Sequence, residues 1–206
     1  MDGNRRWSKK NNVSKIESYQ KGALKILSLS NYIFNNYNIL LISAFALSFH
    51  NFKRPKSTTK ILINVFQYFI ETFESSRFNF KIKILGDLNF LDKEMLIRIN
   101  KLQNKNNDAL NTLILFVNYS GKKDIENAAL NCKKNDLFNK YLSTKFLPDP
   151  DILVRTGGYK RISDFLLYQL SFTELFFLDK LWPDITYRDI RKIINNFIKI
   201  DRNFGV

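Results

Sequence analysis

Hydrophobic residues follow two alternating patterns along the chain, one with helical spacing and one in short continuous runs. The helical spacing predicts helices at residues 14–36, 92–105 and 122–134, and two that start at a cap, one from Ser57 or Thr58 to about Ser75 and one from Thr186 to about residue 201. The continuous runs predict strands at residues 39–46, 81–85, 113–118, 152–154 and 174–177. Helices that alternate with buried strands indicate an α/β fold with a mainly parallel central sheet flanked by helices.

Length and composition are typical of a globular protein. The chain has 206 residues, of which 45% are hydrophobic and 25% charged, and this length is enough for one domain with a substantial core. Repeats and interdomain linkers are missing, so we expect a single domain over residues 1–206. No hydrophobic run reaches the length of a membrane span, and the first residues lack a signal-peptide pattern. We therefore expect a cytoplasmic protein, with peripheral membrane contact left open.

The formal net charge of +14 narrows the class of partner. Such a charge suits nucleic acid, an anionic membrane surface or anionic substrates. The lysines are spread along the chain without a dense block, and no nucleic-acid-binding motif is recognisable, which disfavours nucleic acid as a partner. We read much of the charge as solvated surface, and expect the remainder to favour diphosphates and anionic lipid headgroups.

The first ten residues, MDGNRRWSKK, combine the groups that a metal-bound diphosphate needs. Asp2 can bind a hard cation such as Mg²⁺. Gly3 allows backbone N–H groups to approach an anion, and Arg6, with Arg5 beside it, can grip phosphate oxygens through a planar fork of donors. The alternative is a solvated, charged terminus without a ligand.

A further polar run follows the strand predicted at residues 152–154. Arg155, Arg161 and Ser163 flank a turn at Gly157-Gly158, and Glu174 follows in a hydrophobic stretch. Ligands in open α/β sheets bind at the carboxyl ends of strands, where this run is expected to lie. The alternatives are that Ser163 caps a helical turn near Asp164 and that Glu174 is a surface strand residue. The hydrophobic stripe of residues 57–78 fits either a core or a lipid tunnel.

These two runs resemble the motifs of the cis-prenyltransferases, most closely those of bacterial undecaprenyl diphosphate synthases. The N-terminal run resembles the family pattern MDGN-x-RW-x-KK. The run after residue 154 resembles the family pattern RT-[SG]-G-x-x-R-[IL]-S-[ND]-FLLWQ, followed by Glu and LWPD. Weaker matches lie between them at Ser48 with residues 51–55, at Gly86-Asp87 and at residues 118–121. The resemblance thus covers nearly the whole chain.

The resemblance implies an enzyme that transfers isopentenyl units from isopentenyl diphosphate to an allylic diphosphate. The expected primer is farnesyl diphosphate, the new double bonds are cis, and the product is a polyprenyl diphosphate such as the undecaprenyl lipid carrier. It also implies Mg²⁺ as cofactor and a homodimer with part of the C-terminal half at the interface. The alternative is a catalytically impaired accessory subunit, which retention of Asp2 argues against.

The resemblance also assigns a role to individual residues. Asp2 and Asn51 correspond to catalytic residues, and Asp2 and Glu174 to metal ligands. The residues that correspond to substrate-binding positions are Gly3, Asn4, Arg6, Trp7, Lys15, Tyr19, Ser48, Phe52, Arg54, Arg155, Arg161 and Ser163. Among them, Gly3, Asn4, Arg6 and Arg54 are expected to bind the allylic diphosphate, and Arg155, Arg161 and Ser163 the isopentenyl diphosphate.

Several positions depart from the family pattern. Arg5 replaces a glycine, Lys15 an arginine and Lys160 a histidine, and Ser18-Tyr19 replaces a glycine-histidine pair. Lysine keeps the charge of arginine but loses its fork of donors. The resemblance further implies a buried strand before Met1, so the fold is expected with its first strand missing. We expect the reading frame to encode about six more residues, rich in Ile and Val, upstream.

Overall fold

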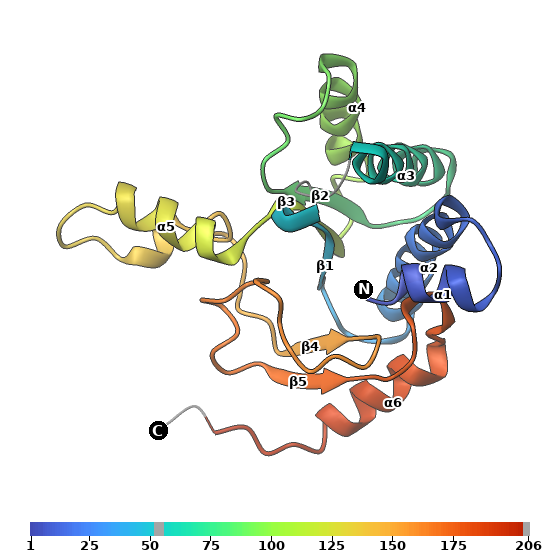
Figure 1. Cartoon of the computed structure of the whole chain (residues 1–206). Coiled ribbons are helices and arrows are strands. Elements are labelled where there is room, and N and C mark those ends of the chain that lie inside the picture. Colours follow the sequence, from blue (N-terminus) through green and yellow to red (C-terminus); the bar gives the residue numbers. More distant parts are fainter. Residues whose placement is uncertain (52–55, 204–206) are drawn as a thin grey trace.

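The computed structural model describes residues 1–51 and 56–203 (Figure 1). Its helices are α1 (Asn4–Lys10), α2 (Lys15–Asn36), α3 (Lys56–Ser75), α4 (Lys93–Asn104), α5 (Gly121–Asn131) and α6 (Tyr187–Phe197), with short 3-10 helices η1 (Phe49–Asn51), η2 (Phe138–Tyr141) and η3 (Trp182–Asp184). Its strands are β1 (Leu41–Ser48), β2 (Lys81–Leu85), β3 (Thr112–Tyr119), β4 (Ile152–Arg155) and β5 (Glu174–Phe177). Within these described ranges, no helix is long and apolar enough to cross a membrane.

The strands are parallel, as predicted, but they form two sheets. Strands β1, β3 and β2 make one sheet in that order, and β4 pairs with β5 in the other. In Figure 1 the N-terminal end lies between these two sheets. Strand β3 is buried almost along its whole length, as expected for the centre of a parallel sheet covered on both faces. The α/β class is therefore confirmed, with its strands divided between two ladders.

Helix boundaries agree with the sequence where a polar cap marks them. The Ser14 hydroxyl accepts a hydrogen bond from the Glu17 amide, and Thr186 and Asp189 form a reciprocal capping box. The predicted cap of α3 is wrong, because this helix already begins at Lys56 and both Ser57 and Thr58 lie within its first turn. Helix α6 also ends earlier than predicted, at Phe197.

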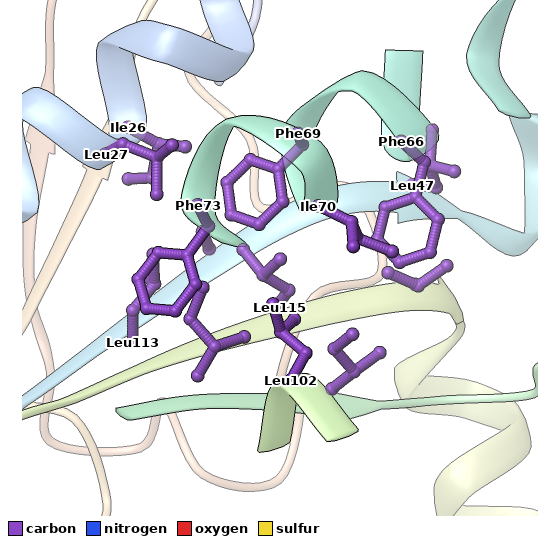
Figure 2. Close-up of a cluster of buried hydrophobic side chains, with 14 of the residues drawn as sticks. Ile26, Leu27, Leu47, Phe66, Phe69, Ile70, Phe73, Leu102, Leu113 and Leu115 are labelled. Carbon is purple, nitrogen blue, oxygen red and sulfur yellow. The ribbon is translucent and has the colours of Figure 1, made fainter. Parts of the chain in front are cut away.

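The core lies between α3 and the three-stranded sheet (Figure 2). Phe66, Phe69, Ile70 and Phe73 recur at the spacing of one helix face and are almost fully buried. They pack in the same cluster as Leu113 and Leu115 of β3 and as Ile26 and Leu27 of α2. This end of the hydrophobic stripe is therefore core, while Phe66 and Phe69 also line a cavity described below.

Candidate functional site

The first polar run is fixed to the carboxyl end of β4 by its backbone. The Asp2 amide donates to the Thr156 hydroxyl, which donates back to the Asp2 carbonyl, both at 2.9 Å. The Trp182 amide donates to the same carbonyl at 2.9 Å. Thr156 is almost fully buried, so this clamp is protected from water. The two runs that the sequence singled out therefore meet, although they are 154 residues apart.

Arginines from both runs converge on the Asp2 carboxylate. Arg155 Nη2 donates to Asp2 Oδ2 at 2.9 Å, and Arg6 Nη2 lies 3.6 Å from Asp2 Oδ1. Arg155 Nη1 also donates to the Ser163 hydroxyl at 2.6 Å and to the Arg161 carbonyl. The Asp2 side chain is 37% exposed, so these ion pairs contribute little to stability. Their effect is to hold a carboxylate and two guanidiniums around one point.

Two glycines make this approach of the chains sterically feasible. Gly157 has φ of +87°, and a Cβ there would lie 2.6 Å from Arg6 Nη2 and 3.2 Å from the Asp2 backbone. Gly3 has φ of +111°, and a Cβ there would lie 2.9 Å from the Leu181 side chain. Any other residue would be strained in backbone conformation and would push the two runs apart. Gly3 thus serves close packing at the start of α1, which sequence pattern did not predict.

The polar loop after β1 approaches the same region. The register of β1 on β3 shifts after Phe45, close to the strand end that carries Ser48. Asn51 donates from its amide to the Ser48 hydroxyl, and His50 Nε2 lies 3.6 Å from Asp164 Oδ2. Ser48 and Asn51 therefore lie on the same cavity as Arg155. The predicted substrate-binding residues Phe52 and Arg54 lie outside the described residues.

Residues 163 and 164 do not start a helix, contrary to the alternative reading of Ser163 as a cap. Both have positive φ, +53° for Ser163 and +67° for Asp164. The Ser163 hydroxyl instead accepts the hydrogen bond from Arg155. Asp164 Oδ1 accepts from the Lys122 amide, and the Asp164 carbonyl accepts from the Gly121 amide. This turn is thus held by α5 and presents Ser163 to the site.

Trp7 and Asn4 fix helix α1 to the neighbouring elements. Trp7 is buried, and its indole N–H donates to Asp184 Oδ1 at 2.7 Å while Lys21 lies over its ring. The Asn4 carbonyl accepts from the Ser18 hydroxyl at 2.6 Å. Ser18, one of the departures from the family pattern, therefore anchors α1 to α2.

Lys15 and Glu174 are not brought to the site within this chain. Lys15 is the exposed first residue of α2 and is not among the cavity-lining residues, whereas Tyr19 of the same helix lines the cavity. Glu174 pairs with Ile152 at one end of the β4–β5 ladder, and Arg155 pairs with Phe177 at the other. Three residues of strand correspond to about 10 Å. The predicted metal pair of Asp2 and Glu174 is therefore not assembled in one chain.

A large cavity joins the polar cluster to a hydrophobic interior. It has a volume of about 1820 Å³, and its lining includes the polar and charged residues Asp2, Arg6, Asn51, Arg155 and Arg161. Its other walls are hydrophobic side chains from helices α2, α3 and α6 and strands β1 and β4, among them Leu29, Ile33, Ala44, Phe69, Leu153 and Ile194. A lining that combines a cluster of charged side chains with apolar walls suits an amphipathic ligand with an anionic head.

The sequence reasoning missed two residues of the site. Thr156 forms the backbone clamp on Asp2, and Tyr159 places its ring among three arginines. The ring centroid is 4.3 Å from the Arg161 guanidinium carbon, 4.8 Å from that of Arg6 and 6.0 Å from that of Arg155. An aromatic residue inside an arginine-rich glycine turn was the available signal for Tyr159.

Comparisons with known proteins give a consistent result. The family model described as putative undecaprenyl diphosphate synthase matches residues 1–205. An isoprenyl transferase of Thermotoga maritima is 34% identical over 219 residues, which cover 100% of this chain and 94% of the relative. A ditrans,polycis-undecaprenyl-diphosphate synthase specific for (2E,6E)-farnesyl diphosphate, from Buchnera aphidicola, is 32% identical over 222 residues, with 100% and 88% coverage.

Solved structures extend this similarity to three dimensions. The crystal structure of lavandulyl diphosphate synthase from Lavandula x intermedia, in complex with dimethylallyl diphosphate, matches with a TM-score of 0.87 and 27% identity over 100% of this chain and 95% of that one. A probable undecaprenyl diphosphate synthase from Campylobacter jejuni matches with a TM-score of 0.76 and 27% identity, covering 92% and 93%. The fold of this chain is thus similar to that of both solved structures.

Proposed function

Because the chain belongs to the undecaprenyl diphosphate synthase family and is therefore a cis-prenyltransferase, we propose that it adds isopentenyl units to farnesyl diphosphate. The product is a polyprenyl diphosphate with new cis double bonds, such as an undecaprenyl carrier. The observation that carries this proposal is the polar cluster around Asp2 at the head of a cavity with apolar walls. Such a cavity can bind a diphosphate at its charged end and a growing hydrocarbon along its walls.

The proposed reaction makes one carbon–carbon bond in each cycle. The terminal alkene carbon of isopentenyl diphosphate bonds to the first carbon of the allylic substrate, and the bond from that carbon to its diphosphate oxygen breaks. Inorganic diphosphate leaves the allylic substrate, and a proton is lost from the isopentenyl unit to form the new double bond. Negative charge builds on the departing diphosphate, and positioned cationic donors stabilise such charge in the transition state.

We assign the two diphosphates to the two polar runs. Arg6, with the backbone around Gly3 and Asn4, binds the allylic diphosphate. Arg155, Arg161 and Ser163 bind the isopentenyl diphosphate, for which the hydrogen bond between Arg155 and Ser163 already sets the geometry. Charge-assisted bonds from guanidinium groups suit phosphate oxygens better than those from lysine.

Ser48 and Asn51 are proposed to orient the reacting ends and to assist proton removal. The hydrogen bond from the Asn51 amide to the Ser48 hydroxyl leaves the Asn51 carbonyl oxygen as an acceptor. Both residues line the same cavity as the arginines. Their place on this cavity supports a role in bringing the two substrates together.

Asp2 fits the requirements of a Mg²⁺ site that is completed by substrate. Mg²⁺ is commonly bound by one or two carboxylates together with phosphate oxygens and waters. Asp2 is partly exposed and lines the cavity, and the described residues contain no group of three or more His, Cys, Asp or Glu that could hold a metal. When bound, the ion would neutralise charge on the departing diphosphate. We propose Asp2 as the protein ligand of that ion.

We further propose that the protein is a homodimer with part of its C-terminal half at the interface. Exposed hydrophobic side chains in this half, among them Phe146, Leu175 and Ile198, support this. Glu174 could then contribute to a site in the dimer even though it lies far from Asp2 within its own chain. Light scattering at micromolar concentration tests this, and a fully active monomer would contradict it.

The net charge of +14 supports contact with an anionic membrane surface by a cytoplasmic protein. A product with a long hydrocarbon chain has to be delivered to a membrane, so the positive charge of the protein and the nature of its product both favour membrane contact. Sedimentation with vesicles of phosphatidylcholine alone and with added phosphatidylglycerol tests this. Binding that needs the anionic lipid and weakens with salt is the expected result.

The function is tested by incubating purified protein with labelled isopentenyl diphosphate, farnesyl diphosphate and Mg²⁺. We expect labelled polyprenyl products that are extracted into an organic solvent and that disappear when Mg²⁺ is chelated. The length of the products is read by thin-layer chromatography. Absence of incorporation by the isolated protein, with incorporation restored by a catalytic partner, would favour the accessory-subunit alternative.

A further inference from the structure

We propose that Tyr159 is a positioning residue that holds the arginines of both diphosphate subsites in place without neutralising them. Its ring lies 4.3 Å from the Arg161 guanidinium carbon and 4.8 Å from that of Arg6. One arginine comes from each polar run, so a single ring joins the two subsites. This inference rests on the proposed function and deepens it, because it names a residue that prepares the same site for its substrates.

The contacts of Arg161 show why a ring is suited to this task. Among the described residues, no carboxylate forms an ion pair with the Arg161 side chain. The Arg161 guanidinium is instead oriented by its contact with the Tyr159 ring. A carboxylate in that place would have to be displaced by an incoming diphosphate. The face of an aromatic ring attracts a cation but carries no net charge. The Arg161 charge is therefore oriented and still available to an anion.

Arg6 and Arg155 differ from Arg161 because both contact Asp2. Their charges are partly balanced by that carboxylate, which is also the proposed metal ligand. For Arg6 the separation from Asp2 is 3.6 Å, longer than a direct hydrogen bond between the two groups. Asp2 alone therefore orients the Arg6 guanidinium only weakly, and the contact with the Tyr159 ring is a second interaction that orients it.

The backbone of the glycine turn fixes the ring itself. The Gly157 amide donates to the Lys180 carbonyl at 2.7 Å, and the Gly158 amide donates to the Leu178 carbonyl at 2.9 Å. Both glycines have positive φ, which allows this tight path. Tyr159 follows directly and lines the cavity at 45% exposure. Its position is therefore set by the protein before any diphosphate arrives.

Tyr159 contacts the arginines through its ring and not through its hydroxyl. Within the described part of the chain, the Tyr159 hydroxyl makes no hydrogen bond, and its contacts are with guanidiniums over the ring. Tyr159→Phe should therefore bind both substrates nearly as the wild type does, whereas Tyr159→Leu and Tyr159→Ala should bind them more weakly. A merely space-filling role would be preserved in Tyr159→Leu.

The experiment compares Tyr159→Phe, Tyr159→Leu and Tyr159→Ala with the full-length protein. Each exposed cation–π contact corresponds to about a two- to fivefold change in affinity. We expect Tyr159→Ala and Tyr159→Leu to raise KM for both substrates about two- to fivefold, and Tyr159→Phe to stay within about twofold. The matched control is Tyr187→Ala, since Tyr187 is 48% exposed and stacks on Tyr32 instead of an arginine. Its KM values should not change.

Binding of inorganic pyrophosphate, measured by calorimetry on the same proteins, separates this inference from the proposed function. Weaker pyrophosphate binding by Tyr159→Leu than by Tyr159→Phe supports the positioning role, even if the wild-type protein makes no prenyl product. Equal binding by all three variants, or no binding by the wild type, would overturn it. If Tyr159→Ala fails to fold, as judged by its melting transition, the comparison of Leu with Phe decides alone.

Discussion

The half of the molecule built on β1, β3 and β2 and the half built on β4 and β5 are stabilised in different ways. The first buries hydrophobic side chains on both faces of β3, one face in a cluster with α3 and α2 and the other against Leu153, Phe165 and Leu166. The other has strands of only four residues and combines hydrophobic contacts with polar ones, such as the clamp of Thr156 on Asp2. Burying a polar group is costly unless it is hydrogen-bonded, whereas partly exposed polar contacts leave charged groups available. Stability and chemistry are thus concentrated in different halves.

The largest effect should come from the hydrophobic half. Phe73→Ala should lower the free energy of unfolding by about 3–5 kcal/mol, because Phe73 is fully buried and its removal leaves a cavity. Chemical denaturation by urea measures this value. The control Leu130→Ala removes a side chain that is 84% exposed and should change the free energy by less than about 0.5 kcal/mol. A similar loss in both variants would show that the packing is not as described.

Asp2→Asn should have the opposite effect, a large loss of turnover with little change in the free energy of unfolding. We expect turnover to fall by on the order of 100-fold or more, because the metal ligand and the partner of Arg155 and Arg6 are lost together. The free energy of unfolding should change by less than about 1 kcal/mol, since the carboxylate is partly exposed. Steady-state turnover and urea unfolding are measured on the same preparation. Near-normal turnover would refute the assignment of Asp2.

Arg161→Ala should discriminate between the two subsites within the polar half. Loss of one charge-assisted contact to isopentenyl diphosphate, worth about 1.5–3 kcal/mol, raises KM for this substrate about 10- to 150-fold. KM for the allylic diphosphate should rise much less, by the indirect effect through Tyr159. Initial rates with each substrate varied in turn give both values, and Arg77→Ala serves as a control on an exposed arginine that does not line the cavity. Equal effects on both substrates would mean that the subsites are assigned wrongly.

The smallest effect concerns pH and the start of α6. Burial raises the pKa of the Asp189 carboxyl, but hydrogen bonds from Lys180 and Thr186 outweigh it and hold this pKa below its usual value. The folded pKa is depressed, so the stabilisation is present above the unfolded value of about 3.9 and is lost as pH falls through the folded pKa. Asp189→Asn should therefore cost about 1 kcal/mol at neutral pH and little in acid. Urea unfolding at both pH values measures this, and an equal cost at both would contradict it.

The sequence predicted most of the hydrophobic half correctly because burial leaves a periodic pattern. The bounds of β2 were predicted to the residue, and those of α4 and β3 to within one residue. Helix α1 was missed because its seven residues are mostly charged and contain no hydrophobic repeat. The division of the strands into two sheets was also missed, since hydrophobic patterns identify strands but do not state their neighbours.

The polar half was predicted by motif, and its geometry came only with the structure. The sequence singled out Asp2, Arg155 and Ser163, but their direct contacts depend on chain segments that are far apart. Tyr159 was overlooked because an aromatic ring becomes a cation partner only through the fold. Glu174 was expected as a metal ligand, and the ladder register places it at the far end of β5 from Arg155. A motif identifies which residues belong to a site, but it does not give the distance in space between residues of two motifs.

The clamp of Thr156 on Asp2 also has a consequence for how the protein is made. A nascent chain emerges from the ribosome with its N-terminus first. The residues of α2 through β3 therefore emerge early and can fold on one another while synthesis continues. Asp2 must wait for partners more than 150 residues later in the sequence. Contacts of such long range form late and slowly. A nascent chain should therefore acquire its hydrophobic core well before it can bind a diphosphate, and enzymatic competence becomes one of the last events of its biogenesis.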